Sequence, residues 1–171
     1  DGITIDENQA NIDLVIGTAN YDIGHVFTNS GSGLAATPAT CIAGNKARAT
    51  TGSTNPIGDP FDIDYVAHEM GHQFIGKHTQ YNDACNRNNT TAIEPGSAST
   101  IMGYAGVCAP FVQLHSDAYF ATSSVVEIRN YVATGFGNTC DNAVAVANTA
   151  PTVTALTNYS IPISTPFVQT A

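Results

Sequence analysis

The chain has 171 residues and a formal net charge of −9, with 14 acidic and five basic side chains. A length of this order accommodates one domain and a tail, not two complete domains. Nucleic acids and anionic membrane surfaces bind clustered basic side chains, so neither is expected as a partner. Because no run of about 18 apolar residues occurs, we expect a soluble protein without membrane insertion.

The four cysteines lie far apart and include no CxxC pair; they are Cys41, Cys85, Cys108 and Cys140. An even number at wide spacing favours two disulfides over a thiolate metal site or a redox dithiol, and three pairings are open. Disulfides are typical of exported proteins. The chain opens without an initiator Met or a basic and apolar leader, so we expect a signal and any pro-segment upstream of Asp1.

The N-terminal part of the chain predicts a helix followed by strands. In residues 5–16, isoleucines recur near helical spacing after acidic and amide residues, which predicts a helix. Residues 21–28 (YDIGHVFT) are typical of a strand, and residues 29–33 (NSGSG) of a turn. Residues 34–52 contain short β-compatible pieces broken by proline and glycine, so we expect an edge strand and a loop there.

The clearest helix is predicted over residues 58–76 (GDPFDIDYVAHEMGHQFIG). Asp59 can cap its N-terminus, Pro60 suits the first turn, and acidic side chains follow near the positive end of the helix dipole. Gly76 is expected to end the helix. An irregular stretch is predicted over residues 79–100.

A last helix is predicted over residues 116–133, with a buried face made by Tyr119, Val126, Ile128 and Tyr131. From residue 143 onward the sequence lacks Lys, Arg, Asp and Glu and is dense in Thr, Val and Pro. We therefore expect one domain over residues 1–147. Residues 148–171 are predicted to be a linker and the start of a truncated immunoglobulin-like β-module.

The segment HEMGH carries the chemistry of the chain, because it places His68 and His72 one turn apart on one helix face. Two such imidazoles can converge on one metal ion. His78 follows ten residues after His68, where a chain leaving the helix can supply a third imidazole. Three histidines leave one coordination position open, as in catalytic zinc sites. Glu69 is then placed to take a proton from water at that position and to deliver it to the leaving amine.

Residues 68–78 (HEMGHQFIGKH) and 99–106 (STIMGYAG) together resemble the metzincin zinc peptidases, which carry HExxHxxGxxH and a Met-turn. The chain is most similar to the bacterial reprolysin-like peptidases, over about residues 5–146. The resemblance implies an α/β (α+β) metzincin-type catalytic domain with a twisted mixed sheet, a central zinc-binding helix, a Met-turn and a C-terminal helix. Only 67 residues precede His68, so the N-terminal part of such a domain is expected to be reduced or incomplete.

The resemblance also assigns roles within the site. Met102 is expected to form an apolar floor beneath the metal. Tyr104 stands where some metzincins carry a tyrosine that binds the metal or stabilises the tetrahedral oxyanion, with a packed aromatic as the alternative. The glycine of the family signature is Ile75 here, and since a β-branched residue tolerates positive φ poorly, Gly76 is expected to make the turn. Asp83 or Glu94 could then replace His78 as third ligand, but the Met-turn favours His78.

For the disulfides, joining Cys85 to Cys108 would clamp the loop between the third ligand and the Met-turn. Cys41 would then pair with Cys140, which resembles the reprolysin bridge from the segment before the zinc helix to the C-terminal helix.

The predicted function is a secreted, bacterial zinc endopeptidase that acts on proteins or peptides and has no obligate protein partner. The alternative is a non-catalytic zinc-stabilised or adhesive module, suggested by the Ile75 departure. Oxygen-rich residues 82–94 raise calcium as a second cofactor, but they lack the spacing of a calcium loop, so a solvated loop is preferred. His25 and His115 are expected to lie outside the site.

Overall fold

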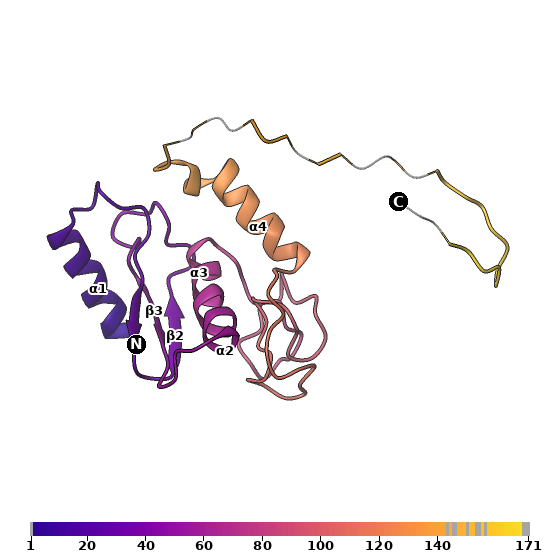
Figure 1. The fold of residues 1–171 in the computed structure, drawn as a ribbon, viewed down its shortest axis with the longest axis horizontal. Helices are drawn as coiled ribbons and strands as arrows, with labels where there is room; N and C mark the ends of the chain where they lie inside the picture. Colours follow the sequence, from indigo (N-terminus) through magenta and orange to yellow (C-terminus); the bar gives the residue numbers. More distant parts are fainter. Residues whose placement is uncertain are drawn as a thin grey trace. The chain divides into compact units, whose positions relative to one another are not determined.

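The structure is a computed structural model that describes residues 2–142, 144, 147–149, 151–152, 155 and 157–168. The chain divides into two compact units, Asp1–Asp141 and Asn142–Ala171. In the described residues the helices and strands all fall in the first unit (Figure 1). They are α1 (Gly2–Val15), β1 (Val26–Thr28), β2 (Ser32–Ala35), β3 (Ala49–Gly52), α2 (Asp59–Phe61), η1 (Asp62–Ala67), α3 (His68–Gln73), α4 (Thr122–Ala133) and η2 (Phe136–Asn138).

Helix α1 confirms the helix predicted over residues 5–16, although it begins three residues earlier. Its buried residues are Ile5 and Gln9. Two amide side chains tie the helix to the segment that enters β3. Asn8 Nδ2 donates to the Ala47 carbonyl at 2.7 Å, and Gln9 Oε1 accepts from the Ala47 N–H at 2.7 Å. Polar bonds thus hold α1 in place where the apolar contact is small.

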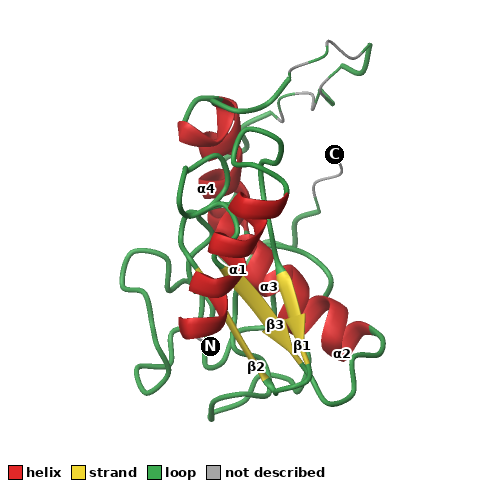
Figure 2. Ribbon diagram, turned by 90° about the vertical axis from the view of Figure 1, so that its left-hand side faces the viewer, coloured by secondary structure: helices red, strands yellow, loops and turns green. Residues whose placement is uncertain are grey.

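A three-stranded mixed sheet in the order β1-β3-β2 forms the centre of the unit (Figure 2). Strand β3 pairs parallel with β1 and antiparallel with β2, so that Thr50 lies opposite both Val26 and Leu34. Helices α1 and α3 lie on opposite sides of the sheet in Figure 1 and both contact β3. This mixed α/β arrangement confirms the predicted fold class.

The edge strand expected in residues 34–52 is present only as the second half of β2, because β2 begins at Ser32, inside the turn predicted over residues 29–33. The prediction is wrong for β3, which is the central strand. All four residues of β3 are buried. Small Ala, Thr and Gly side chains fit this position because helices cover both faces. Of the strand predicted over residues 21–28, only the last three residues pair in the sheet. The Gly24 N–H instead donates to the Lys46 carbonyl at 2.7 Å.

The long helix predicted over residues 58–76 is present as α2, η1 and α3 in succession. The central piece, η1, is π-helical. The prediction that Asp59 caps the N-terminus is wrong. Gly58 occupies the cap, no side chain bonds there, and Asp59 is the first helical residue. Gly58 has φ 67°, a left-handed conformation that lets the chain enter the helix without a side-chain cap.

The turn after α3 also differs from the prediction, because Ile75 itself adopts the left-handed conformation, with φ 75°. The Gly76 N–H bonds the Gly71 carbonyl at 2.8 Å, and the Ile75 N–H bonds the His72 carbonyl at 2.9 Å. These two bonds define a Schellman ending with Ile75 as its left-handed residue. The turn is therefore not displaced to Gly76. A glycine is needed at position 76 because the backbone there passes close to the end of α3: an added Cβ would lie 2.9 Å from the Gly71 carbonyl oxygen.

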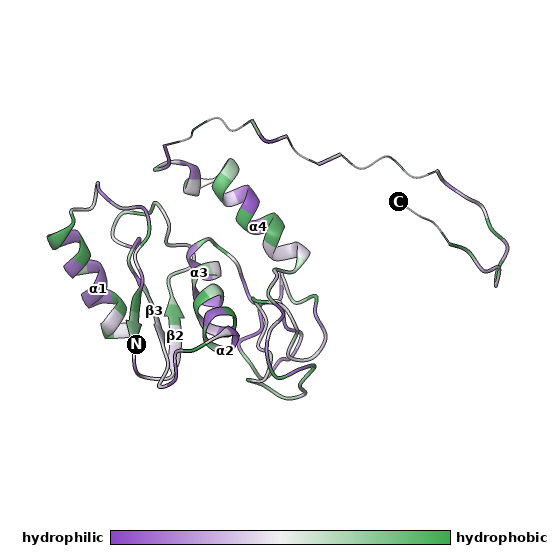
Figure 3. Cartoon of the chain, in the orientation of Figure 1, coloured by the Kyte–Doolittle hydropathy of each residue, from purple (hydrophilic) through white to green (hydrophobic). Residues whose placement is uncertain are grey.

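Helix α4 begins at Thr122, six residues later than predicted. Ser116 and Asp117 are held elsewhere: the Ser116 N–H donates to the Asp64 carboxylate at 2.7 Å and the Asp117 N–H to the Ser99 carbonyl at 2.8 Å. The predicted buried face is correct for Tyr131 only. Val126 is 51% exposed, Tyr119 is 55% exposed and Ile128 is half-buried. Figure 3 shows apolar and polar residues alternating along α4.

The second unit has no helix or strand among its described residues. Its rings of Tyr159 and Phe167 lie 5.2 Å apart. The unit boundary falls after Asp141, slightly before the predicted boundary at residue 147. The immunoglobulin-like β-module over residues 148–171 stays a prediction, and part of it falls on residues 150, 153–154, 156 and 169–171, outside the described residues. Among the described residues, no helix has both the length and the apolar character that crossing a membrane requires.

Candidate metal centre

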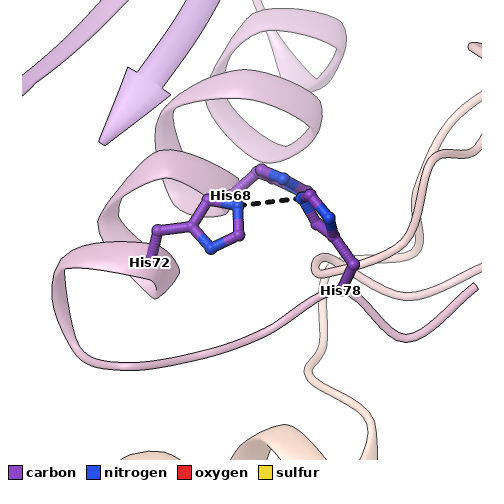
Figure 4. A group of neighbouring side chains, drawn as sticks. All are labelled: His68, His72 and His78. Atoms are coloured by element: carbon purple, nitrogen blue, oxygen red, sulfur yellow. Dashed lines mark hydrogen bonds between the residues drawn. The ribbon is translucent and has the colours of Figure 1, made fainter. Parts of the chain in front are cut away.

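Three histidines meet at the C-terminal end of the long helix. His68 and His72 lie on α3, and His78 lies on the segment that follows the Ile75 turn. Their ligand atoms all lie within 4.8 Å of one another. Figure 4 shows the three imidazoles directed toward one another, and its dashed line joins His72 and His78. The Schellman turn brings His78 back to the helix face that carries the other two.

Each of the three imidazoles is backed by a main-chain carbonyl. A carbonyl oxygen only accepts, so each Nδ1 carries the hydrogen and each Nε2 keeps its lone pair. This outer hydrogen bond is the usual device that orients a metal-binding histidine. The pairs are His68 Nδ1 with Ile101 O at 2.7 Å, His72 Nδ1 with Gly76 O at 2.7 Å, and His78 Nδ1 with Asn86 O at 2.8 Å.

The three Nε2 atoms fit a zinc ion. Burial, followed by the neighbouring histidines, lowers the pKa of His68 to about 3 and that of His72 to about 4. Burial also lowers the pKa of His78, so all three rings are neutral at pH 7. His72 Nε2 and His78 Nε2 lie 3.0 Å apart with no hydrogen to share, which is repulsive unless a cation accepts both lone pairs. Zinc–nitrogen bonds of about 2.0–2.1 Å in a tetrahedral site require nitrogen separations of about 3.3 Å.

Glu69 presents a carboxylate oxygen with no partner. The residue is 7% exposed, and its Oε2 is buried without a hydrogen bond in the described structure. Burial raises the pKa of this carboxyl to about 7. Strand β2 passes directly over the same group, because a Cβ added at Gly33 would collide with the Glu69 carboxylate. The edge strand therefore confines Glu69 beside the histidines.

A cleft of 610 Å³ opens beside His68 and Glu69. Its walls come from the start of β2, from the segment between β3 and the long helix, from the long helix itself, and from residues 103–107 and 114–116. Its charged lining residues are Asp64 and Glu69. Asp64 accepts a bond from His115 Nδ1 at 2.7 Å, and both residues line the cleft. His115 is a surface residue and is not one of the three grouped histidines, as expected. The lining residues include Gly31, Gly33, Tyr65, Tyr104, Leu114 and Ser116.

Met102 lies beneath the helix that carries the first two histidines. It is fully buried, and a Cβ added at Gly71 would collide with its sulfur. The Met102 carbonyl accepts the Thr79 N–H at 3.1 Å, which ties the Met-turn to the residue after His78. The apolar floor expected from the sequence thus lies in contact with α3.

Tyr104 lies against two of the histidines. Its ring centroid is 4.5 Å from that of His78 and 5.7 Å from that of His68. Asn86 Nδ2 donates to the Tyr104 hydroxyl at 3.3 Å. Tyr104 is also one of the residues that line the cleft.

The other candidate ligands are occupied elsewhere. Asp83 pairs with Arg87. Glu94 accepts bonds from the Ser99 and Thr100 N–H groups and from Thr100 Oγ1 at 2.6 Å. His25 bonds Gln73 and Thr51 through its two ring nitrogens, as expected for a satisfied interior histidine.

Within the part of the chain that the structure describes, the three histidines are the one group of three or more His, Cys, Asp or Glu side chains that lie close enough together to hold a metal ion. Calcium in residues 82–94 therefore receives no support.

The comparison with protein families agrees with this centre. The family model described as metallo-peptidase family M12B, Reprolysin-like, matches residues 1–79, which include α1, the sheet and all three histidines. The match spans 79 of the 171 residues, and together with the three histidines it is consistent with a metzincin-like protein. No curated protein and no solved structure matches the chain. The match and the histidine group support a zinc metallopeptidase in general, and such a family implies proteins or peptides as substrates.

Both disulfides are formed in the structure. Cys41 pairs with Cys140, with Cα atoms 5.4 Å apart, and Cys85 pairs with Cys108, with Cα atoms 6.2 Å apart. These are the pairs that the loop argument and the resemblance favour. Two disulfides are consistent with an extracellular protein.

Sequence reasoning missed three features of the site: the carbonyls that back the histidines, the contact of Gly33 with Glu69, and the Asp64–His115 pair on the cleft wall. The first involves main-chain atoms, which carry no sequence signal. The glycine-rich run NSGSG before Leu34 was the one available hint of a close backbone approach.

Proposed function

We propose that the chain is a secreted zinc endopeptidase in which His68, His72 and His78 hold the metal and Glu69 is the general base and acid. The observation that carries this proposal is the unpartnered Oε2 of Glu69, buried beside three convergent histidines and at the edge of a cleft. A buried carboxylate oxygen without a donor costs stability, which a purely structural metal site has no reason to retain. This observation supports catalysis over the non-catalytic zinc module.

Bound zinc would supply a Lewis acid that lowers the pKa of water and polarises a scissile carbonyl. Glu69 Oε2 then accepts a proton from the attacking water and returns it to the amine that leaves. Gly33 and the buried surroundings of Glu69 hold the carboxylate in one position for both transfers. Tyr104 is assigned to the developing oxyanion, because the residue lines the cleft and its ring lies against His68 and His78.

The substrate is proposed to lie extended along β2, the edge strand. Gly31 and Gly33 line the cleft at this strand, and glycine leaves room for another backbone to approach. Main-chain hydrogen bonds to an edge strand bind an extended peptide without demanding one sequence. This geometry suits an enzyme that cuts within a chain.

The test compares wild type, Glu69→Gln and Glu7→Gln for zinc content and for hydrolysis of a quenched peptide. Glu7 is an exposed residue of α1 and serves as the matched control. We expect Glu69→Gln to keep one zinc and lose about 10²–10⁴-fold in kcat, with Glu7→Gln unchanged. Wild-type protein that holds one zinc yet hydrolyses nothing, or activity in Glu69→Gln equal to wild type, would contradict the proposal.

A further inference from the structure

The three main-chain carbonyls that bond the histidines differ in how firmly the surrounding structure restrains them. The Ile101 carbonyl belongs to the buried Met-turn, and the Gly76 carbonyl belongs to the helix ending that fixes His72. The Asn86 carbonyl, which backs His78, lies on an exposed segment without helix or strand. Orientation of the third imidazole therefore depends on what restrains this segment.

A disulfide and a buried amide restrain it. Cys85, the residue before Asn86, is bonded to Cys108 at the end of the Met-turn region. Its carbonyl accepts a bond from Nε2 of Gln80 at 2.6 Å, and Gln80 is fully buried. The disulfide thus fixes the residue next to the carbonyl that His78 uses.

Asn86 itself has a left-handed conformation, with φ 54°. Asparagine and glycine adopt this conformation readily, whereas β-branched residues do not. The conformation turns the Asn86 carbonyl toward His78 Nδ1 while the side-chain amide donates to Tyr104. One residue on the disulfide-bound loop thereby contacts the third histidine and the tyrosine of the site.

We propose that Asn86 is a positioning residue for the metal centre, and that the Cys85–Cys108 disulfide sets zinc affinity by holding its carbonyl on His78. The inference rests on the zinc centre proposed above but not on catalysis. The second disulfide provides a contrast. Residues beside Cys41 bond Gln73 and Tyr131 rather than a ligand imidazole.

The experiment measures zinc dissociation constants of the oxidised full chain by competition with a chromophoric chelator. We expect Cys85→Ser/Cys108→Ser to bind zinc about 10- to 100-fold more weakly, the usual loss for an outer partner of a metal-binding histidine. Cys41→Ser/Cys140→Ser should change affinity much less. Equal zinc affinity in the wild type and the Cys85→Ser/Cys108→Ser protein, or an equal loss in both double variants, would overturn the proposal.

A second pair of variants tests the Asn86 carbonyl separately from the disulfide. These variants keep all four cysteines, so the test remains valid if the cysteine variants misfold. Asn86→Gly and Asn86→Val both delete the amide that bonds Tyr104, but only valine opposes the left-handed conformation. Zinc affinity should stay near wild type in Asn86→Gly and fall about 10-fold in Asn86→Val. Equal affinities in the two variants would show that the carbonyl does not set zinc affinity.

Peptide hydrolysis is recorded in parallel on the wild-type protein. If the affinity pattern holds while hydrolysis is absent, the proposed peptidase function fails and the metal-positioning role stands. If hydrolysis is present but the variants bind zinc as tightly as the wild type, the metal-positioning role fails and the proposed peptidase function stands.

Discussion

Ile75 shows how a single residue can depart from a family signature without moving the site. A β-branched residue stands where the signature has glycine, yet Ile75 adopts a left-handed conformation, and His78 meets the other two histidines. The helix ending supplies the compensation through the Gly76 to Gly71 and Ile75 to His72 bonds. The resulting strain is local to one residue.

Replacing Ile75 with glycine should therefore raise the free energy of unfolding slightly. Relief of left-handed strain, about 1–2 kcal/mol, exceeds the entropy cost of glycine, about 0.5–1 kcal/mol. Urea denaturation of the metal-free protein measures the difference. Gly76→Ala serves as the contrast and should destabilise, because its Cβ would lie 2.9 Å from the Gly71 carbonyl oxygen. A clear loss of stability in Ile75→Gly would mean that its side-chain packing outweighs the strain.

Gly33 controls Glu69 through space rather than through a bond. We expect Gly33→Ala to push the carboxylate out of place and to lower kcat about 10²-fold, with zinc affinity unchanged. Gly2→Ala is the control, since Gly2 lies on α1 outside the cleft lining and has nothing within 4 Å of an added Cβ. Steady-state hydrolysis and chelator competition on both variants separate the two effects. An equal kcat in both variants would argue against confinement of Glu69 by β2.

At the scale of elements, the close contact between α3 and the Met-turn links the zinc-site helix to the later part of the first unit. The contact exists because Gly71 has no side chain, so the buried sulfur of Met102 reaches the helix backbone. The Met102 carbonyl adds a bond to Thr79, and the Ile101 carbonyl adds the bond to His68. The same short turn therefore supports the helix, the segment after His78 and one histidine.

A double-mutant cycle on this contact tests its role. Gly71→Ala should destabilise the metal-free protein by about 1–3 kcal/mol through overpacking. Met102→Ala should cost about 2–5 kcal/mol through the cavity that it leaves. The double variant should lose less than the sum, because the new methyl group occupies space vacated by the methionine. Strictly additive free energies of unfolding would indicate that the two residues do not contact each other.

At the scale of the whole molecule, the net charge of −9 acts on a cleft whose described lining includes no Lys or Arg. Four of the five basic residues are engaged elsewhere: Lys46 with main-chain carbonyls, Arg48 with Asp6, Lys77 with Glu127 and Arg87 with Asp83. Arg129 lies exposed on α4. The electrostatic field at the cleft is consequently set by acidic groups, Asp64 and Glu69 among them.

We therefore predict faster cleavage of cationic than of anionic peptides. Two quenched peptides that differ only in Lys or Glu residues away from the scissile bond should differ about 10-fold in kcat/KM at low salt, favouring Lys. The ratio should fall toward one as ionic strength rises, because screening shortens the range of the field. Asp64→Asn should reduce the low-salt ratio. A ratio near one at all ionic strengths would contradict this reading of the charge distribution.

Much of the fold and of the site follows from local sequence. Helix α1, the long helix ending near residue 74 and the helix before Cys140 are visible in periodicity and composition. His68, Glu69 and His72 are fixed by spacing on one helix, because neighbours four residues apart share a face. The strand order could not be obtained in this way, since Ala49–Gly52 is too short and too small in side chains to signal a buried central strand.

The sequence by itself determined the donor set: three histidines, one carboxylate and a methionine at spacings that a helix and two turns convert into proximity. Only the tertiary structure decided that Ile75 rather than Gly76 makes the left-handed turn, that Gly33 approaches the Glu69 carboxylate closely, and that the Asn86 carbonyl bonds His78. These outcomes rest on main-chain conformation and on contacts between residues far apart in the chain. Apart from the glycine-rich run at residues 29–33, the local side-chain pattern gives no signal for either.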